Sequence, residues 1–405
     1  MAAMTLRLYY TEPWRRQFEA TVTAVEPSAR GTTVRLDRTA FYPTSGGQPF
    51  DTGTLDTVPV IEVVDEEDDG VAHVLEVAPS ASGLAVGRRV TGVIDWRRRL
   101  DHMQQHTGQH MLSAAFEHLH HVRTESFHLG ADVATIDMAR EVTALEIETA
   151  QAEANRVVWD DRGVSIRFVT EQEAERLPLR KEPVKTGRLR LIEIEGFDLS
   201  ACGGTHVSRT GAVGIIAVRS WERFRGGTRV AFVCGGRALA AFQALRDAVD
   251  RAAGPLSVHP LELPAAIERL QGERKELQRA VRQMGERLAG FEAEALALSA
   301  SEHEGVSVVV EAVDGYDANA LKTMAIAFVR RPARLAVLFS TSHPSQVIVA
   351  RSADLERINC ADVVRGLCLQ FGGKGGGRPE LAQGGGLDAP PPELVAAARH
   401  SVSGR

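Results

Sequence analysis

Two short motifs that lie far apart in the 405-residue chain constrain its fold most strongly: His106-Thr-Gly-Gln-His110 and Cys202-Gly-Gly-Thr-His206. The first lies in a segment with apolar residues at helical spacing, and histidines four residues apart on a helix project from the same face. In the second, two glycines permit a tight turn that brings a thiolate and an imidazole around one point. Three imidazole nitrogens and one sulfur suit tetrahedral Zn²⁺, so we expect the fold to bring both motifs together.

Other histidines and cysteines compete for a place in this site. His102 lies one turn before His106 on the same face, and we expect it beside the metal or facing the substrate. The remaining cysteines have no histidine at metal spacing and are interpreted as small buried apolar residues: Cys234, Cys360 and Cys368. A closed shell of four ligands is also typical of structural zinc, so a non-catalytic zinc domain in an RNA-binding protein remains open.

Composition narrows the class of protein. Four cysteines in a chain of this length do not indicate a disulfide framework and favour a reducing, cytoplasmic setting. No stretch approaches the roughly 20 apolar residues of a membrane span, and the N-terminus lacks a secretory signal. The formal net charge of −6 argues against a uniformly basic surface but allows local basic patches.

Two groups of basic residues are candidates for such patches. The first contains Arg176, Arg180, Lys181, Lys185, Arg188 and Arg190, and the second contains Arg219, Arg223, Arg225, Arg229 and Arg237. Each group is compatible with an ordinary solvated face as well as with contacts to RNA phosphates.

The alternation of patterns predicts a multidomain α+β protein. We expect a β-barrel-like unit over 1–92, a zinc-binding α+β domain over 93–238, a helical linker over 239–302, a glycine-rich α/β domain over 303–396 and a frayed tail over 397–405. We expect strands near 133–138, 164–169, 190–195 and 213–218 within the second of these domains.

The predicted linker carries an apolar seam with alternating spacings of three and four. Its members are Ile267, Leu270, Leu277, Val281, Met284, Leu288 and Phe291, and Arg274 interrupts it. This pattern predicts either a coiled-coil arm that dimerises or a helix packed on its own domain.

Two glycine-containing segments are candidate binding loops. In Thr39-Ala-Phe-Tyr-Pro-Thr-Ser-Gly-Gly-Gln48, Gly46 and Gly47 permit close approach of a ligand, and Gln48 offers donors and acceptors. Read alone, this loop is also typical of a turn between strands. Glycines 372–377 lack the Ser or Thr of a Walker A motif, but their amides with Lys374 and Arg378 could bind phosphates.

Taken together, the motifs resemble the editing domain of alanyl-tRNA synthetase and its free-standing relatives, the AlaX proteins. HTGQH and CGGTH match that family in order and spacing. Further similar segments are RTAFYPTSGGQPFDTG (38–53), SFHLG (126–130), TID (135–137), RGGTRVAFVCGG (225–236) and, in a C-terminal domain shared with DHH phosphoesterases, GGKGGGRPELAQGGG (372–386).

The resemblance implies specific roles for these residues. It assigns zinc to His106, His110, Cys202 and His206, and substrate reading to Thr39, Gly46, Gly47 and Gln48, with Thr39 sensing a serine hydroxyl. We add His102 and Asp198 as candidate general bases. For tRNA contacts the candidates are Arg180, Lys181, Arg229, Lys374 and Arg378.

The implied activity is hydrolysis of the aminoacyl ester of tRNA(Ala) mischarged with serine or glycine, in trans. Only about twenty residues precede the β unit and no DHH motif occurs, so we expect neither aminoacylation nor phosphodiesterase activity. The implied partners are mischarged tRNA(Ala) and, through the helical linker and the C-terminal domain, a second copy. Two further alternatives are a deacylase for other aminoacyl-tRNAs and a metal-independent peptidyl-tRNA hydrolase that uses the GGQ of residues 46–48.

Overall fold

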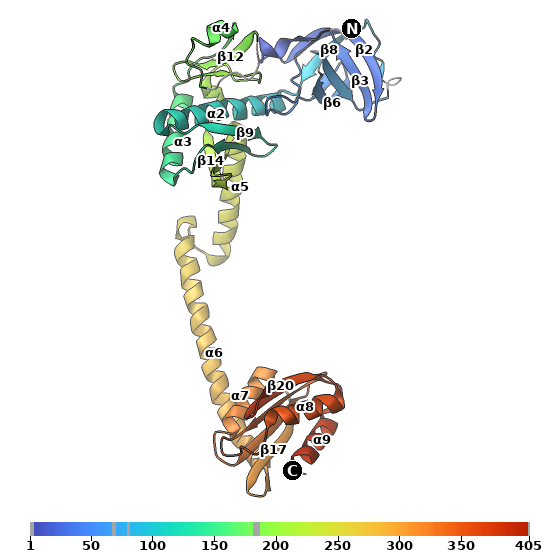
Figure 1. Cartoon of the computed structure of the whole chain (residues 1–405), viewed down its shortest axis with the longest axis vertical. Helices are drawn as coiled ribbons and strands as arrows, with labels where there is room; N and C mark the ends of the chain where they lie inside the picture. Colours follow the sequence, from blue (N-terminus) through green and yellow to red (C-terminus); the bar gives the residue numbers. More distant parts are fainter. Residues whose placement is uncertain (1–3, 67–69, 79–81, 181–186, 404–405) are drawn as a thin grey trace. The chain divides into compact units, whose positions relative to one another are not determined.

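The computed structural model describes residues 4–66, 70–78, 82–180 and 187–403 (Figure 1). Internal contacts divide the chain into two compact units, Met1–Arg251 and Ala252–Arg405. The multidomain α+β architecture is confirmed, whereas the finer division into five segments stays a prediction. Among the described helices, none has the length and apolar character needed to cross a bilayer.

The first unit opens with a closed six-stranded barrel, as the sequence predicts. Going around the barrel, its strands are β2 (Gln17–Ser28), β3 (Gly31–Leu36), β7 (Val71–Leu75), β6 (Val58–Asp65), β5 (Gly53–Leu55) and β8 (Arg89–Ile94). Burial alternates along β3, so that Val34 and Leu36 fill the interior while their neighbours face outward. A short ladder of β1 (Leu6–Arg7) with β4 (Arg38–Thr39) and the turn η1 (Leu8–Tyr10) adjoin the barrel.

The rest of the first unit places helices against two antiparallel sheets. One sheet has the order β14 (Ile216–Phe224), β15 (Gly227–Cys234), β10 (Ala134–Met138), β9 (Thr124–Leu129), and the other has the order β11 (Val164–Val169), β12 (Leu189–Ile194), β13 (Asp198–Ala201). The helices are α2 (Trp96–His120), α3 (Ala144–Trp159), α4 (Glu171–Ala174) and α5 (Gly235–Ala253). The strand expected near 213–218 begins at Ile216, because a 3-10 turn, η2 (Thr210–Val213), comes first.

Helix α2 is the central element of this unit. Asp95 caps its first turn by accepting a hydrogen bond from the Arg98 amide. At Gly108 an added Cβ would lie 2.3 Å from Cys234 Sγ, so the glycine allows β15 to pack closely against the helix. This close packing explains why the polar motif in mid-helix is almost entirely buried.

The second unit contains a six-stranded mixed sheet. Its order is β16 (Ser301–His303), β17 (Val306–Val313), β18 (Arg334–Ser340), β19 (Ser345–Arg351), β21 (Leu381–Leu387), β20 (Lys374–Arg378). The flanking helices are α7 (Ala318–Phe328), α8 (Cys360–Phe371) and α9 (Pro391–Ser403). The glycine-rich segment forms the β20–β21 hairpin rather than a loop. Added Cβ atoms at Gly375 and Gly384 would lie 2.5 and 2.9 Å from Val364, so glycine lets α8 pack closely on these strands.

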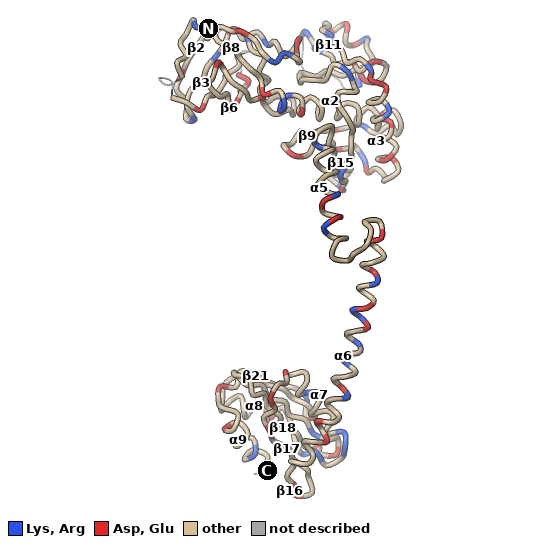
Figure 2. The backbone as a smooth tube through the Cα atoms, turned by 180° about the vertical axis from the view of Figure 1, so that it is seen from behind, with Lys and Arg blue, Asp and Glu red and all other residues tan. Residues whose placement is uncertain are grey.

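The predicted linker consists of two helices rather than one. Helix α5 is followed by two 3-10 turns, η3 (Gly254–Leu256) and η4 (Pro260–Glu262), before α6 (Leu263–Ser299) begins. Near its C-terminal end α6 packs on α7 through Ala289, Ala293 and Leu296. The seven apolar seam residues are exposed, from 44% at Ile267 to 69% at Val281. Charged residues of both signs also line this helix (Figure 2).

Candidate functional site

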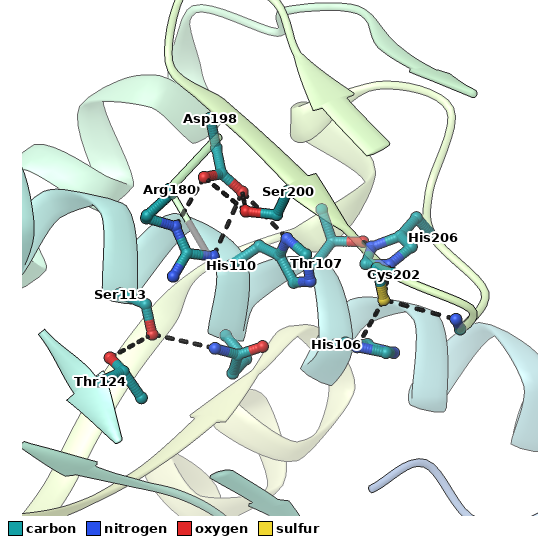
Figure 3. Close-up of polar contacts among 12 residues, drawn as sticks. His106, Thr107, His110, Ser113, Thr124, Arg180, Asp198, Ser200, Cys202 and His206 are labelled. Atoms are coloured by element: carbon teal, nitrogen blue, oxygen red, sulfur yellow. Dashed lines mark hydrogen bonds and ion pairs between the residues drawn. The ribbon is translucent and has the colours of Figure 1, made fainter. Parts of the chain in front are cut away.

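The structure brings the two histidine motifs together into one cluster (Figure 3). Helix α2 supplies His106 and His110, and the loop after β13 supplies Cys202 and His206. The four potential ligand atoms all lie within 4.8 Å of one another. His106, His110 and His206 are buried, and Cys202 is partly buried.

Each imidazole of the cluster is held through its Nδ1 atom. His106 Nδ1 lies 2.9 Å from Gln48 Oε1, and His110 Nδ1 lies 2.9 Å from Asp198 Oδ2. The third contact joins His206 Nδ1 to Thr107 Oγ1 at 3.2 Å. In the tautomer in which every Nδ1 donates, all three Nε2 lone pairs are available to a metal, an arrangement typical of metal-bound histidines.

The spacing of the donors fits a tetrahedral ion. Cys202 Sγ lies 3.4 Å from His106 Nε2 and 3.3 Å from His206 Nε2. Zinc bonds of about 2.3 Å to sulfur and 2.0–2.1 Å to nitrogen, at the tetrahedral angle, give a separation of about 3.5 Å. The donor set and its geometry therefore fit Zn²⁺.

Charges within the cluster favour a thiolate. Burial alone would raise the pKa of Cys202, but His106 and His206 outweigh it and hold that pKa well below its ordinary value. Burial and the neighbouring His106 lower the pKa of His206 to about 3. A thiolate and a neutral imidazole are the forms that bind metal. At His110 burial is outweighed by hydrogen bonds to Asp198 and Cys202, which raise the pKa to about 9, so metal binding releases a proton there.

Asp198 acts on the cluster through His110. Its carboxylate also accepts hydrogen bonds from Arg180 Nε at 2.6 Å and from Ser200 Oγ at 3.0 Å. Burial would raise the pKa of Asp198, but His110 and Arg180 lower it far below the ordinary range. An ionised, fully engaged carboxylate suits a residue that orients His110.

Gln48 connects the barrel loop to both motifs. Its Nε2 donates to Thr205 Oγ1 at 2.8 Å, and its Oε1 accepts from the Thr205 amide at 3.0 Å as well as from His106. Gln48 is fully buried, and Gly47 lies against the Phe127 ring. These contacts fix the position of one metal-facing imidazole relative to the CGGTH turn.

A cavity of about 1030 Å³ adjoins the cluster. His110, Cys202, Gly203 and Gly204 form part of its wall, together with Gly46 of the barrel loop. The structure adds polar residues that sequence reasoning missed: Gln109, Thr124 and Ser126 also line the cavity. Gln109 precedes His110 directly in the HTGQH motif, and this position could have predicted from the sequence that Gln109 lies beside the cluster.

Two of these residues, Gln109 and Thr124, form a small polar network with Ser113. Gln109 Nε2 donates to Ser113 Oγ at 2.9 Å, and Thr124 Oγ1 donates to the same oxygen at 2.8 Å. Gln109 Oε1 is buried and has no hydrogen-bond partner within the part of the chain that the structure describes. Gln109 therefore provides an unused hydrogen-bond acceptor, and both Gln109 and His110 line the cavity.

Two of the remaining predicted residues lie elsewhere. Thr39 is fully buried in the barrel, where its Oγ1 lies 2.8 Å from His73 Nε2 and accepts from the Phe41 amide. His102 is buried outside the cavity lining, and this burial lowers its pKa to about 4. Neither residue is brought to the cavity, and their roles stay predictions.

The predicted tRNA-contacting residues are dispersed. Arg180 lines the cavity, while Arg229 is paired with Asp137 at 2.7 Å. Lys374 and Arg378 are exposed on β20 of the second unit. Lys181 lies outside the described residues.

A Gly204→Ala change is expected to disrupt the cluster. A Cβ at this position would lie 2.1 Å from His106 Cε1 and 3.0 Å from Gln48 Oε1, so the turn must move away from the imidazole. At Gly203 the nearest atoms are 4.0 Å away, which makes Gly203→Ala a matched control. Metal content measured by mass spectrometry should fall strongly for Gly204→Ala and stay near wild type for Gly203→Ala. Equal metal content in both variants would contradict the geometry.

Comparisons with known proteins match several parts of the chain. The family model "Threonyl and Alanyl tRNA synthetase second additional domain" matches residues 189–230, which include Cys202 and His206. The model "tRNA synthetases class II (A)" matches residues 13–98, and "DHHA1 domain" matches residues 305–404.

Individual relatives match nearly the whole chain. The alanine–tRNA ligase of Pyrococcus abyssi is 35% identical over 393 residues, covering 94% of this chain and 42% of that protein. The enzyme of Natronomonas pharaonis is 38% identical over 403 residues, with 95% and 42% coverage. The chain thus spans less than half the length of these curated relatives. Among solved structures, the C-Ala domain of Aquifex aeolicus alanyl-tRNA synthetase aligns with 26% of this chain and 97% of that domain, at 21% identity and a TM-score of 0.24.

Proposed function

We propose that this chain, which is similar to alanine–tRNA ligases over nearly its whole length, is an AlaX-like editing protein that hydrolyses the aminoacyl ester of mischarged tRNA(Ala). The substrates are Ser-tRNA(Ala) and Gly-tRNA(Ala), and the chain acts in trans. One observation carries this proposal: a pre-oriented cluster of four side chains that could hold a metal ion adjoins, through His110 and Cys202, a cavity large enough for an aminoacylated nucleoside.

The need for such an activity follows from the limits of size discrimination. A pocket sized for alanine cannot strongly exclude glycine, which lacks one methyl, or serine, which adds a hydroxyl. Each difference yields a discrimination of only roughly 10–200-fold. A second, hydrolytic site removes the resulting errors.

We propose that the cluster of His106, His110, Cys202 and His206 holds Zn²⁺. When bound, such an ion supplies Lewis-acid chemistry that polarises an ester carbonyl or activates a water. With four protein ligands the shell is closed, which favours a role in positioning the substrate. Gln48, Asp198 and Thr107 keep the three imidazoles in the metal-binding tautomer.

Recognition of serine is proposed to involve the polar wall beside His110. The unpartnered Gln109 Oε1 can accept a hydrogen bond from a serine hydroxyl, which alanine lacks. Leaving a buried acceptor unpaired costs about 1–3 kcal/mol, so this contact favours serine over alanine. Thr39, expected to sense this hydroxyl, remains a second candidate.

A panel of charged tRNAs tests the proposal. Purified protein is added to tRNA(Ala) carrying serine, glycine or alanine, and to a non-alanine tRNA carrying its own amino acid. We expect rapid release of serine, release of glycine, and little effect on the two correctly charged tRNAs. Comparable hydrolysis of the non-alanine tRNA would identify a general deacylase. No hydrolysis of any ester by a metal-loaded protein would favour the structural-zinc alternative.

We also propose that α6 mediates self-association, in an antiparallel arrangement. In a parallel, in-register pair two Arg274 side chains would face each other within the seam, which like charge disfavours. Antiparallel pairing centred near Arg279 instead places Arg274 against Met284 and sets Glu273 near Arg287 of the other copy. The seven exposed seam residues supply the apolar contact.

Changing the centre of the seam is expected to yield monomers. The double variant Leu277→Glu, Val281→Glu introduces charge into both central layers, whereas Gln283→Glu alters an exposed position off the seam. Sedimentation velocity should show a dimer for the wild type and Gln283→Glu, and a monomer for the double variant. A monomeric wild type at tens of micromolar would rule out this use of the seam.

The basic residues that the sequence analysis named as tRNA contacts, where the structure describes them, are proposed to bind tRNA phosphates. Arg180 is the candidate in the first unit, with Lys374 and Arg378 in the second. Arg229 is a further candidate in the first unit; Arg180 is paired with Asp198 and Arg229 with Asp137, so each would use its remaining N–H groups for a phosphate. The cytoplasmic location expected from the sequence stays a prediction.

A further inference from the structure

Arg190 is a buried cation whose charge the structure does not balance with a carboxylate. It lies in β12, within the otherwise mostly apolar run Leu-Arg-Leu-Ile-Glu-Ile, and only 8% of it is exposed. Among the described residues no Asp or Glu forms an ion pair with it.

The hydrogen bonds of Arg190 leave one nitrogen unused. Nε donates to the Tyr10 carbonyl at 2.9 Å, and Nη1 donates to the carbonyls of Cys202 at 2.6 Å and Gly204 at 2.9 Å. Nη2 is buried without a hydrogen-bond partner in the described chain. Nε thus holds the Tyr10 backbone and Nη1 holds the CGGTH turn, while Nη2 keeps its N–H groups free to donate. Leaving a buried donor of a charged group unpaired costs free energy, and a ligand that accepts a hydrogen bond from it therefore binds more tightly.

The cavity wall around Arg190 carries an excess of positive charge. Arg188 lies just before β12, and both Arg188 and Arg190 line the cavity. The wall carboxylates are already neutralised, since Asp65 pairs with Arg7 at 2.6 Å and Glu66 pairs with Arg35 at 2.8 Å. An anion is therefore the complementary ligand.

We infer that Arg190 Nη2 binds a phosphate oxygen of the 3′-terminal nucleotide of the tRNA substrate. Resting on the proposed function, this inference adds a phosphate subsite to the ester-binding cluster. The aminoacyl ester and the phosphate of the same nucleotide are attached to opposite ends of one ribose. Arg190 contacts the carbonyl of Cys202, whose sulfur belongs to the cluster, so both ends of one nucleoside are met by adjoining groups. Guanidinium groups are the side chains best matched to phosphate oxygens.

A second role of Arg190 follows from the same contacts. Because Nη1 holds the Cys202 and Gly204 carbonyls, phosphate binding at Nη2 is coupled to the turn that positions Cys202 and His206. Arg190 is thus both a binding residue for the phosphate and a positioning residue for the turn. A variant must separate these two roles.

Binding of adenosine 5′-monophosphate and adenosine to the zinc-loaded full-length chain tests the inference by calorimetry. The two ligands differ only by the phosphate, so their affinity ratio reports the subsite. We expect wild type to favour the monophosphate by about 10- to 100-fold, the range for hydrogen bonds to charged groups. In Arg190→Gln, which keeps a donor for the turn, this ratio should fall to near one while zinc content is retained. Arg167→Gln, at an exposed arginine of β11, is the matched control and should keep the wild-type ratio.

Several outcomes would overturn the inference. Equal affinity of wild type for the two ligands excludes a phosphate subsite. A parallel loss of both affinities in Arg190→Gln, with the ratio unchanged, assigns Arg190 to holding the turn alone. Arg190-dependent binding of free serine in place of the monophosphate would assign the anion to the carboxylate of the released product. If Arg190→Gln fails to fold, Arg190→Lys takes its place and should lower the ratio in part.

This test is independent of hydrolysis. A wild-type protein that binds the monophosphate through Arg190 yet deacylates no tRNA would retain the subsite and overturn the proposed function. A protein that hydrolyses Ser-tRNA(Ala) but shows no phosphate preference would retain the function and overturn the subsite.

Discussion

Replacing Cys202 with alanine is expected to abolish deacylation of Ser-tRNA(Ala) and to remove most of the bound zinc. Cys202 supplies the only sulfur among the four donors, and Sγ lies within hydrogen-bonding distance of His106 and His206. Loss of the thiolate leaves three neutral imidazoles around a dication, so both affinity and geometry suffer. Single-turnover assays at saturating protein, together with metal analysis, measure both effects. The rate should drop to that of the uncatalysed ester.

Cys368→Ala is the matched control for this change. Cys368 lies in α8 of the second unit and is not among the clustered ligands. It should retain the wild-type rate and zinc content. If Cys202→Ala kept both as well, the cluster would not be the metal centre.

Removing the guanidinium of Arg99 is expected to cause the largest loss of stability. Arg99 and Asp51 are both fully buried, and Arg99 Nε lies 3.0 Å from each carboxylate oxygen. Arg99 also donates to the carbonyls of Pro13 and Ala40, so it fastens α2 to the barrel loop. Breaking a buried pair from one side costs about 3–5 kcal/mol, because the remaining charge stays buried and uncompensated.

Thermal unfolding followed by circular dichroism measures this loss for Arg99→Ala. At roughly 2–4 °C per kcal/mol for a unit of this size, a shift of about 10 °C is expected. Arg156→Ala removes half-exposed contacts with Glu153 and Asp160 and should shift the midpoint by no more than a few degrees. Equal shifts for the two variants would show that the buried pair contributes little.

Local patterns predicted a large part of the fold correctly. The apolar residues at helical spacing after His106 predict a helix, and α2 spans both motif histidines. Alternating β-branched residues predict β3, and the barrel-like unit is a closed barrel. These features depend on side-chain period along the chain, which the sequence displays directly. The two motifs were also expected to come together, because three imidazole nitrogens and one sulfur suit a single tetrahedral ion, and the four ligand atoms do lie within 4.8 Å of one another.

The contacts that orient these donors were not predictable from local pattern. Gln48 was expected to read substrate, yet its side chain bonds His106 and Thr205, residues far away in the sequence. Thr39 was likewise expected at the substrate, but its position in β4 directs it to His73 inside the barrel. These contacts depend on how the barrel packs against α2, and the spacing of residues along the sequence does not reveal that packing.

Arg190 was classified with a basic run on the surface, although a signal was present. A charged residue between apolar neighbours in a predicted strand is expected to be buried or paired. The glycine-rich segment was expected to form a loop because of its composition, but it forms a hairpin. Its glycines are needed there because α8 packs closely on the two strands. Glycine content alone does not distinguish these two needs.

One measurement tests the central claim most directly: the rate of Ser-tRNA(Ala) deacylation as zinc is removed and restored. Chelation should abolish hydrolysis while the circular dichroism spectrum keeps its barrel and helix signals, and addition of zinc should restore the rate in proportion to occupancy, up to one ion per chain. Full activity of the metal-free protein would contradict the account. Unfolding of the protein on chelation, together with no hydrolysis of the ester by the zinc-loaded protein, would also contradict the account.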